Sequence, residues 1–203
     1  MDNNSTTQQR LLSSMVQFGL FFVQDIPSYN SSNELKTLKS FFELPLETKM
    51  ALAVKKHRPE SSNAYRGYGP LVGGLTTQFK EMYNIGPFND IPQFKPSSTE
   101  NSLELYRAVG RETNLWPKTD DPMFDTHFKN SFIKSFETRR SVGKAVVRCI
   151  GSVLGHPELS DRFIEHEFST LGLRRYPAGT EDRLTELEHE DSTVTILSTF
   201  QVR

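Results

Sequence analysis

The chain has 203 residues, with 24 Lys and Arg against 25 Asp and Glu and a net charge of −1. This balance excludes the strongly basic surface with which proteins bind nucleic acids or anionic membranes, so we expect neither partner. The length suffices for one large or two small domains with a real hydrophobic core, and 15 phenylalanines supply bulky side chains for that core.

Cysteine usage and hydropathy indicate the compartment. The single cysteine, Cys149, has no partner for an internal disulfide, which favours a reducing environment. Its apolar, helical surroundings predict a buried structural thiol, with a catalytic nucleophile as the alternative. The longest apolar run, Gly19 to Val23, is far too short to cross a bilayer. We therefore expect a soluble, cytoplasmic protein.

The first fifty residues predict a layer of helices. Apolar residues recur at helical spacing over 8–18, and a short buried strand is expected at 20–23. Capping residues at 30–33 begin a second helix, which Pro45 ends, and a further helical turn is expected over 48–53.

A loop and a strand should follow this helical layer. Residues 55–75 are polar and rich in glycine, which predicts a long surface loop, and loops of this length are uncommon unless they are functional. The stretch 78–85 has the composition of a strand. Residues 86–98 contain three prolines and are expected to be a connector.

A long helix is the main element of the second half. Asp121 and Pro122 are typical of an N-cap and a first helical residue, and apolar residues recur at helical spacing as far as a stop at Gly155. A second, short helix is expected over 159–167. The stretch 172–177 predicts a strand that proline ends.

The last fifteen residues contain a pair of metal-binding side chains. In a strand, residues i and i+2 project from the same face, so His189 and Asp191 would point the same way, about 6 to 7 Å apart at Cα. An imidazole nitrogen beside a carboxylate oxygen suits a divalent metal, and a second His would complete the two-His-one-carboxylate site of non-haem Fe(II) oxygenases. The alternative is a solvated turn within an acidic segment.

Seven motifs occur in one order along nearly the whole chain. They are Phe18-Gly19-Leu20-Phe21-Phe22-Val23, Phe41-Phe42-Glu43-Leu44-Pro45 with Lys49, Tyr65-Arg66-Gly67-Tyr68-Gly69-Pro70, Lys80-Glu81, Asn114-Leu115-Trp116-Pro117, Arg175-Tyr176-Pro177 and His189-x-Asp191. In this order the chain resembles the isopenicillin N synthase-like family of Fe(II)- and 2-oxoglutarate-dependent dioxygenases.

The resemblance implies an α+β fold in which an N-terminal helical layer packs on a double-stranded β-helix, or jelly roll. Residues 1–115 would form the non-haem dioxygenase N-terminal region. Residues 116–203 would contribute the scaffold helix and the first strands of the jelly roll, which would be incomplete at its C-terminal end. The open sheet edge left there predicts self-association.

The resemblance also assigns site residues. His189 and Asp191 match the first two iron ligands of the family, and Tyr176 matches a tyrosine that in many members reaches the co-substrate carboxylate. The alternative for Tyr176 is a core aromatic residue whose hydroxyl finds a partner. The expected reaction is the oxidation of a small-molecule substrate with O₂ and 2-oxoglutarate.

Two family features have no counterpart after Asp191: the second His ligand, and the Arg-x-Ser that holds the far carboxylate of 2-oxoglutarate. The remaining histidines are predicted to be surface or cap residues: His57, His127, His156 and His166. Fe(II) and 2-oxoglutarate should therefore bind poorly. Two hypotheses stay open: a fragment or isoform of an active oxygenase, and a catalytically inactive binding or interaction protein of the same fold.

Overall fold

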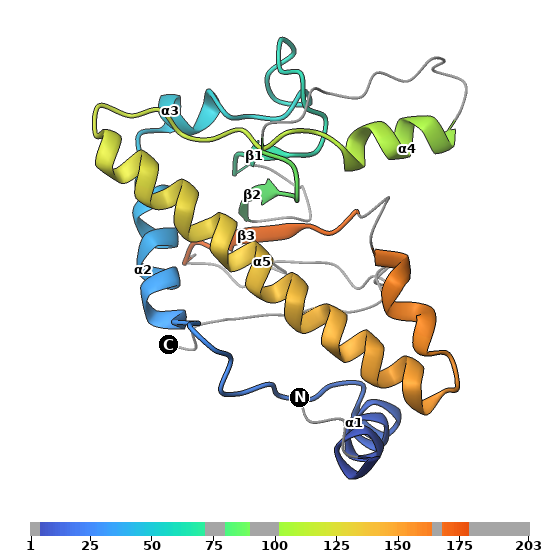
Figure 1. Cartoon of the computed structure of the whole chain (residues 1–203). Helices are drawn as coiled ribbons and strands as arrows, with labels where there is room; N and C mark the ends of the chain where they lie inside the picture. The colour runs from blue at the N-terminus through green and yellow to red at the C-terminus, as the bar shows by residue number, and fades with distance from the viewer. Residues whose placement is uncertain (1–4, 72–79, 90–101, 164–167, 179–203) are drawn as a thin grey trace.

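The computed structural model describes residues 5–71, 80–89, 102–163 and 168–178. Helices and one small antiparallel sheet make up this part of the chain, so the predicted α+β class is confirmed (Figure 1). The jelly roll stays a prediction, because residues 179–203, which would continue it, lie outside the described part.

The helices of the described part differ greatly in length. They are α1 (Ser5–Phe18), α2 (Ser31–Phe42), α3 (Leu46–Met50), α4 (Ser102–Gly110), α5 (Pro122–Val153) and the 3-10 helix η1 (Pro157–Phe163). The strands are β1 (Gly67–Gly69), β2 (Glu81–Ile85) and β3 (Leu171–Arg175). None of the described helices is long and apolar enough to cross a membrane.

The long helix α5 runs across the molecule, and its ends are where the sequence predicts them (Figure 1). Asp121 Oδ1 accepts hydrogen bonds from the backbone N–H groups of Met123 and Phe124 at 2.9 and 3.2 Å, as an N-cap should. At the other end Gly155 has a φ of +77°, and the N–H of His156 donates to a carbonyl of the last turn at 2.7 Å. This is the glycine-dependent termination that the sequence predicts.

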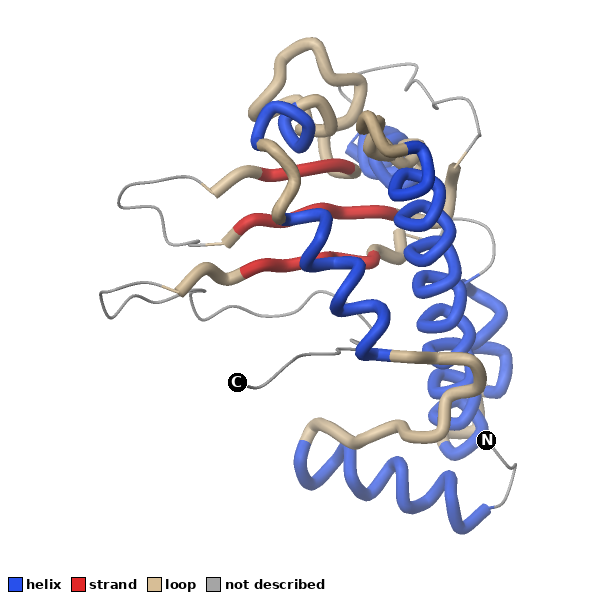
Figure 2. Tube along the Cα trace, turned by 90° about the vertical axis from the view of Figure 1, so that its left-hand side faces the viewer, coloured by secondary structure: helices blue, strands red, loops and turns tan. Residues whose placement is uncertain are grey.

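The three strands lie side by side in one sheet (Figure 2). Their order is β1-β2-β3, and both pairings are antiparallel. Tyr68, Tyr83 and Leu173 are direct neighbours across the strands, and all three are buried. Two strands come from the first predicted region and one from the second, so the sheet joins the two regions. The domain boundary after residue 115 stays a prediction.

Aromatic side chains of α2 and α5 pack over Tyr68, Tyr83 and Leu173 and form the core. Phe41 stacks on Phe128 with ring centroids 4.8 Å apart, and the Phe41 ring is also 4.8 Å from that of Tyr83. Phe132, one turn further along α5, lies 4.8 Å from Phe128. All of these rings are buried, so the helical layer and the sheet share one core.

A polar contact also joins α2 to the middle of α5. Glu34 binds the guanidinium of Arg139 with both carboxylate oxygens, at 2.6 and 2.8 Å, and both side chains are largely buried. Arg139 also donates to the hydroxyl of Tyr29 at 3.0 Å and lies over its ring. A bidentate pair of this kind fixes direction as well as distance, so it sets the angle at which α2 crosses α5.

The short buried strand predicted at 20–23 is wrong. This segment links α1 to α2 without strand structure, and Phe22 is 89% exposed. A strand needs a partner for its backbone groups, and no described strand pairs with it. The apolar run alone did not reveal this, because burial depends on what lies opposite.

The surface loop predicted at 55–75 is confirmed over 55–65, which has no helix or strand and is exposed or partly exposed apart from Asn63. The prediction is wrong over 66–69. Arg66 and Tyr68 are almost fully buried, and β1 lies within the stretch. The glycines allow close packing rather than exposure: a Cβ at Gly67 would lie 2.5 Å from the carbonyl oxygen of Leu52. The carboxylate of Glu112 accepts from three successive backbone N–H groups, residues 64–66, which fixes the approach to β1.

The other predicted elements agree with the structure where it describes them. α1, α2, α3, β2 and β3 fall within or overlap the predicted ranges, and Cys149 is buried as expected. The second short helix is present as the 3-10 helix η1. The helix α4 was not predicted, although Leu103, Tyr106 and Val109 recur in it at helical spacing.

Replacing Phe128 by Ala should destabilise the fold by about 3–5 kcal/mol, because the ring lies at the centre of the aromatic core. The matched control is Phe22→Ala, which removes an exposed ring and should change stability by less than about 0.5 kcal/mol. Urea unfolding followed by circular dichroism measures both. Equal losses in the two variants would contradict the position of this core.

Candidate functional site

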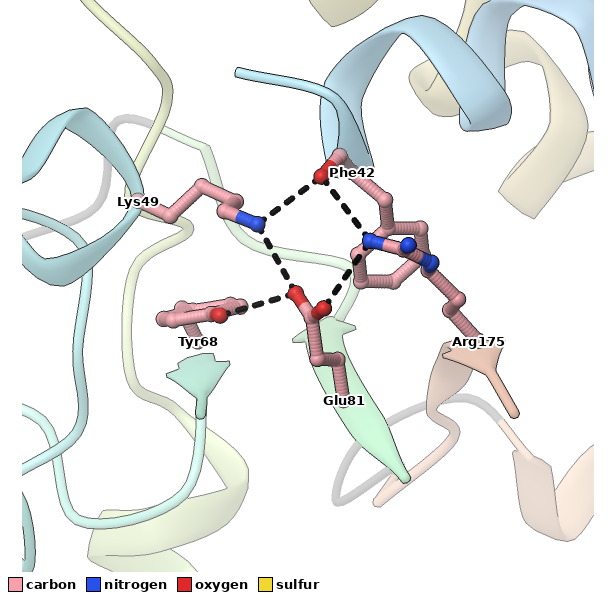
Figure 3. A network of polar contacts seen from close by, with 5 residues as sticks. All are labelled: Phe42, Lys49, Tyr68, Glu81 and Arg175. Carbon is pink, nitrogen blue, oxygen red and sulfur yellow. Dashed lines mark hydrogen bonds and ion pairs between the residues drawn. The ribbon is translucent and has the colours of Figure 1, made fainter. Parts of the chain in front are cut away.

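The carboxylate of Glu81, the first residue of β2, lies at the centre of a buried polar network (Figure 3). Its Oε2 accepts from Lys49 Nζ at 2.9 Å and from the hydroxyl of Tyr68 at 2.9 Å. Its Oε1 accepts from Arg175 Nη1 at 3.0 Å. One carboxylate therefore connects α3, β1 and β3 to β2.

Lys49 and Arg175, the two cationic side chains that bind Glu81, also reach the end of α2. The carbonyl oxygen of Phe42, the last residue of α2, accepts from Lys49 Nζ at 2.8 Å and from Arg175 Nη1 at 3.3 Å (Figure 3). Carbonyls of the last helical turn have no partner within the helix, so they bind such donors well. The network thus holds the helical layer against the end of β3.

Burial governs the electrostatics of this network. The side chains of Lys49 and Glu81 are 6% and 9% exposed, whereas that of Arg175 is 45% exposed. Burial raises the pKa of Tyr68, and its hydrogen bond to the negative Glu81 raises it further. Tyr68 therefore stays protonated at neutral pH and acts as a donor. Mutually paired groups of this kind suit positioning rather than proton transfer.

Sequence reasoning quoted Lys49, Glu81 and Arg175 as motif residues but did not anticipate that they meet. They lie far apart in the chain, and only the antiparallel register, which pairs Glu81 with Arg175, places two of them side by side. The available signal was a charged residue inside each of three predicted elements, 48–53, 78–85 and 172–177. It did not say which charges pair.

Tyr176, the predicted co-substrate residue, directly follows β3 and is 48% exposed. The alternative of a core aromatic residue is therefore wrong. Its neighbour Arg175 is held by Glu81 and Phe42, so the backbone leading into Tyr176 is anchored. A contact of the Tyr176 hydroxyl with a co-substrate stays a prediction.

The predicted metal ligands His189 and Asp191 lie outside the described residues, and so does His166. Within the described part, no three His, Cys, Asp or Glu side chains come together in a way that could hold a metal ion. His127 and His156 are exposed there, as predicted for surface or cap residues. The assignment of His189 and Asp191 as iron ligands stays a prediction.

Comparisons with known proteins agree with the motif order. The family described as non-haem dioxygenase in morphine synthesis N-terminal matches residues 2–119, more than half of the chain. The 2-oxoglutarate-Fe(II) type oxidoreductase ppzC of Metarhizium majus is 26% identical over 170 residues, which cover 78% of this chain and 42% of the relative.

Solved structures share the fold. Neurospora crassa T7H, in a complex with alpha-KG, matches with a TM-score of 0.61 and 22% identity over 87% of this chain and 51% of that protein. A putative 2OG-Fe(II) oxygenase family protein of Caulobacter crescentus matches with a TM-score of 0.60 and 24% identity, over 87% and 53% of the two chains. The chain thus spans about half the length of these relatives.

The family match covers both the helical layer and the strands that carry Tyr68 and Glu81. The resemblance predicted from the ordered motifs is confirmed by this match and by the relatives of similar sequence. The chain belongs to the non-haem dioxygenase N-terminal family and is a distant relative of the 2-oxoglutarate-Fe(II) oxygenases.

Proposed function

We propose that this chain serves the Fe(II)- and 2-oxoglutarate-dependent oxidation of a small organic molecule by O₂. The observation that carries the proposal is the anchoring of β3, which ends one residue before Tyr176 and is held by Arg175 against Glu81 and Phe42. A residue that contacts a co-substrate must be held firmly by its surroundings. The relatives' printed names, which mention 2-oxoglutarate and Fe(II), support the same function.

The proposed iron ligands are His189 and Asp191. A neutral imidazole nitrogen and a carboxylate oxygen are donors that Fe(II) accepts readily. Bound iron would supply the activation of O₂, while Tyr176 would donate a hydrogen bond to a carboxylate of 2-oxoglutarate. Two protein ligands hold a metal less firmly than three, so we expect weak binding of both iron and co-substrate.

A second candidate function is a non-catalytic binding protein of the same fold. It is favoured by the network around Glu81, whose buried groups are paired with one another and therefore suit positioning rather than proton transfer. In this case the buried network around Glu81 would serve stability alone. Metal binding and turnover separate the two candidates.

Replacing His189 by Ala should weaken Mn(II) binding at least about tenfold, because one of two proposed protein ligands is lost. Mn(II) replaces Fe(II) in this experiment to avoid oxidation, and isothermal titration calorimetry measures the affinity. His156→Ala, which removes an exposed imidazole elsewhere, is the matched control and should bind as the wild type does. Equal affinity of the wild type and His189→Ala would refute the assignment.

The 203-residue chain alone should form no measurable succinate from 2-oxoglutarate under O₂ with Fe(II). Iron held by only two proposed protein ligands would bind weakly, and 2-oxoglutarate would be poorly held with it. Chromatographic detection of succinate, compared with Fe(II) and buffer without protein, tests this. Succinate formation that depends on the protein would show that an unrecognised residue completes the site, and would exclude the non-catalytic candidate.

Glu81→Gln should destabilise the protein by about 3–5 kcal/mol, because it leaves the buried Lys49 ammonium without its carboxylate. Backbone amide signals of β3 should shift as well, since Arg175 loses an anchor. Urea unfolding and ¹⁵N NMR measure the two effects. The matched control is Glu137→Gln, whose exposed pair with Arg140 should contribute less than about 1 kcal/mol. A Glu81 variant as stable as this control would mean that the network does not hold β3.

A further inference from the structure

The two faces of the sheet differ in the side chains that project from them. Side chains alternate along a strand, so Tyr83 and Leu173 face the aromatic core, while Asn84 and Arg174 project from the opposite side. The same alternation, extended one residue beyond β3, places Tyr176 on the side of Arg174. The anchoring residue Arg175 lies on the core side, where it contacts Glu81.

Arg174 is held in a defined orientation by its own sheet. Its Nη1 donates to Asn84 Oδ1 at 2.8 Å and to the carbonyl oxygen of Leu173 at 3.1 Å. Asn84 is oriented in turn, because its Nδ2 donates to the carbonyl oxygen of Tyr65 at 3.3 Å. The amide of Asn84 therefore presents its oxygen, and not its nitrogen, to the guanidinium.

The guanidinium of Arg174 occupies the space that a side chain at Gly172 would fill. A Cβ built on Gly172 would lie 2.6 Å from Nη2 and 2.8 Å from Cζ of Arg174, closer than real contacts allow. The guanidinium thus lies directly against the strand backbone at Gly172, where a larger residue would have to displace it. An arginine oriented in this way loses little further side-chain entropy when it binds a ligand.

We propose that Arg174, positioned by Asn84, binds a carboxylate on the side of the sheet that also carries Tyr176. The planar fork of a guanidinium matches the two oxygens of a carboxylate. The carboxylate can come from the 2-oxo acid co-substrate or from the organic substrate. This inference deepens the proposed function and rests on it for the role of Tyr176, but carboxylate binding by Arg174 requires no metal.

The experiment is a ¹⁵N NMR titration of the whole chain, without metal, using 2-oxoglutarate and benzoate as separate probes. Wild-type signals of the Gly172 amide, the Arg174 Nε–H and the Asn84 side-chain amide should shift on addition of a probe. Arg174→Gln should raise the Kd at least about tenfold, because a charge-assisted hydrogen bond is lost. Arg148→Gln, which removes the same charge from an exposed position on α5, is the matched control and should leave the Kd unchanged.

The two probes distinguish the source of the carboxylate. Tighter Arg174-dependent binding of 2-oxoglutarate assigns the group to the co-substrate, and tighter binding of benzoate assigns it to the organic substrate. Wild-type signals at Gly172 and Asn84 that do not move with either probe would overturn the proposal, even if Arg174→Gln failed to fold. Equal Kd values for Arg174→Gln and the wild type would overturn it too. Loss of Mn(II) binding alone would concern His189 and leave this result intact.

Discussion

The arrangement of this protein depends on the hydrogen bonds that the buried carboxylate of Glu81 accepts. It accepts hydrogen bonds from Lys49, Tyr68 and Arg175, and the two cations also bind the last carbonyl of α2, that of Phe42. Removing a carboxylate from water is costly, so such a group persists only where several donors compensate it. Because those donors come from separate elements, the compensation itself fixes how the helical layer meets the sheet.

The aromatic core and the polar network divide this task between them. Stacked rings such as Phe41 and Phe128 supply most of the apolar burial, but apolar contacts alone tolerate sliding. Directional contacts, those of Glu81 and those between Glu34 and Arg139, set the orientation of the helices over the sheet. The consequence for the proposed function is an anchored β3 whose neighbouring arginines lie on opposite sides of the sheet: Arg175 toward the network and Arg174 toward the proposed carboxylate site.

Much of the local structure could be predicted because it depends on near neighbours. The start of α5 at Asp121 and its end at Gly155 follow from capping chemistry that acts within a few residues. Segments whose state depends on distant partners were predicted wrongly. The apolar stretch around Phe22 is exposed, and the glycine-rich stretch around Tyr68 is a buried strand. Hydrophobicity and glycine content do not reveal whether a partner strand lies alongside.

The sequence by itself determined the family, through motifs in a fixed order, and it named Tyr176, His189 and Asp191 as the residues of a candidate iron and co-substrate site. Only the tertiary structure decided that Glu81 joins Lys49 to Arg175, and that Arg174 is oriented by Asn84 over Gly172. The physical reason is strand register. Pairing β2 with β3 brings together side chains about ninety positions apart, and no local pattern encodes that distance.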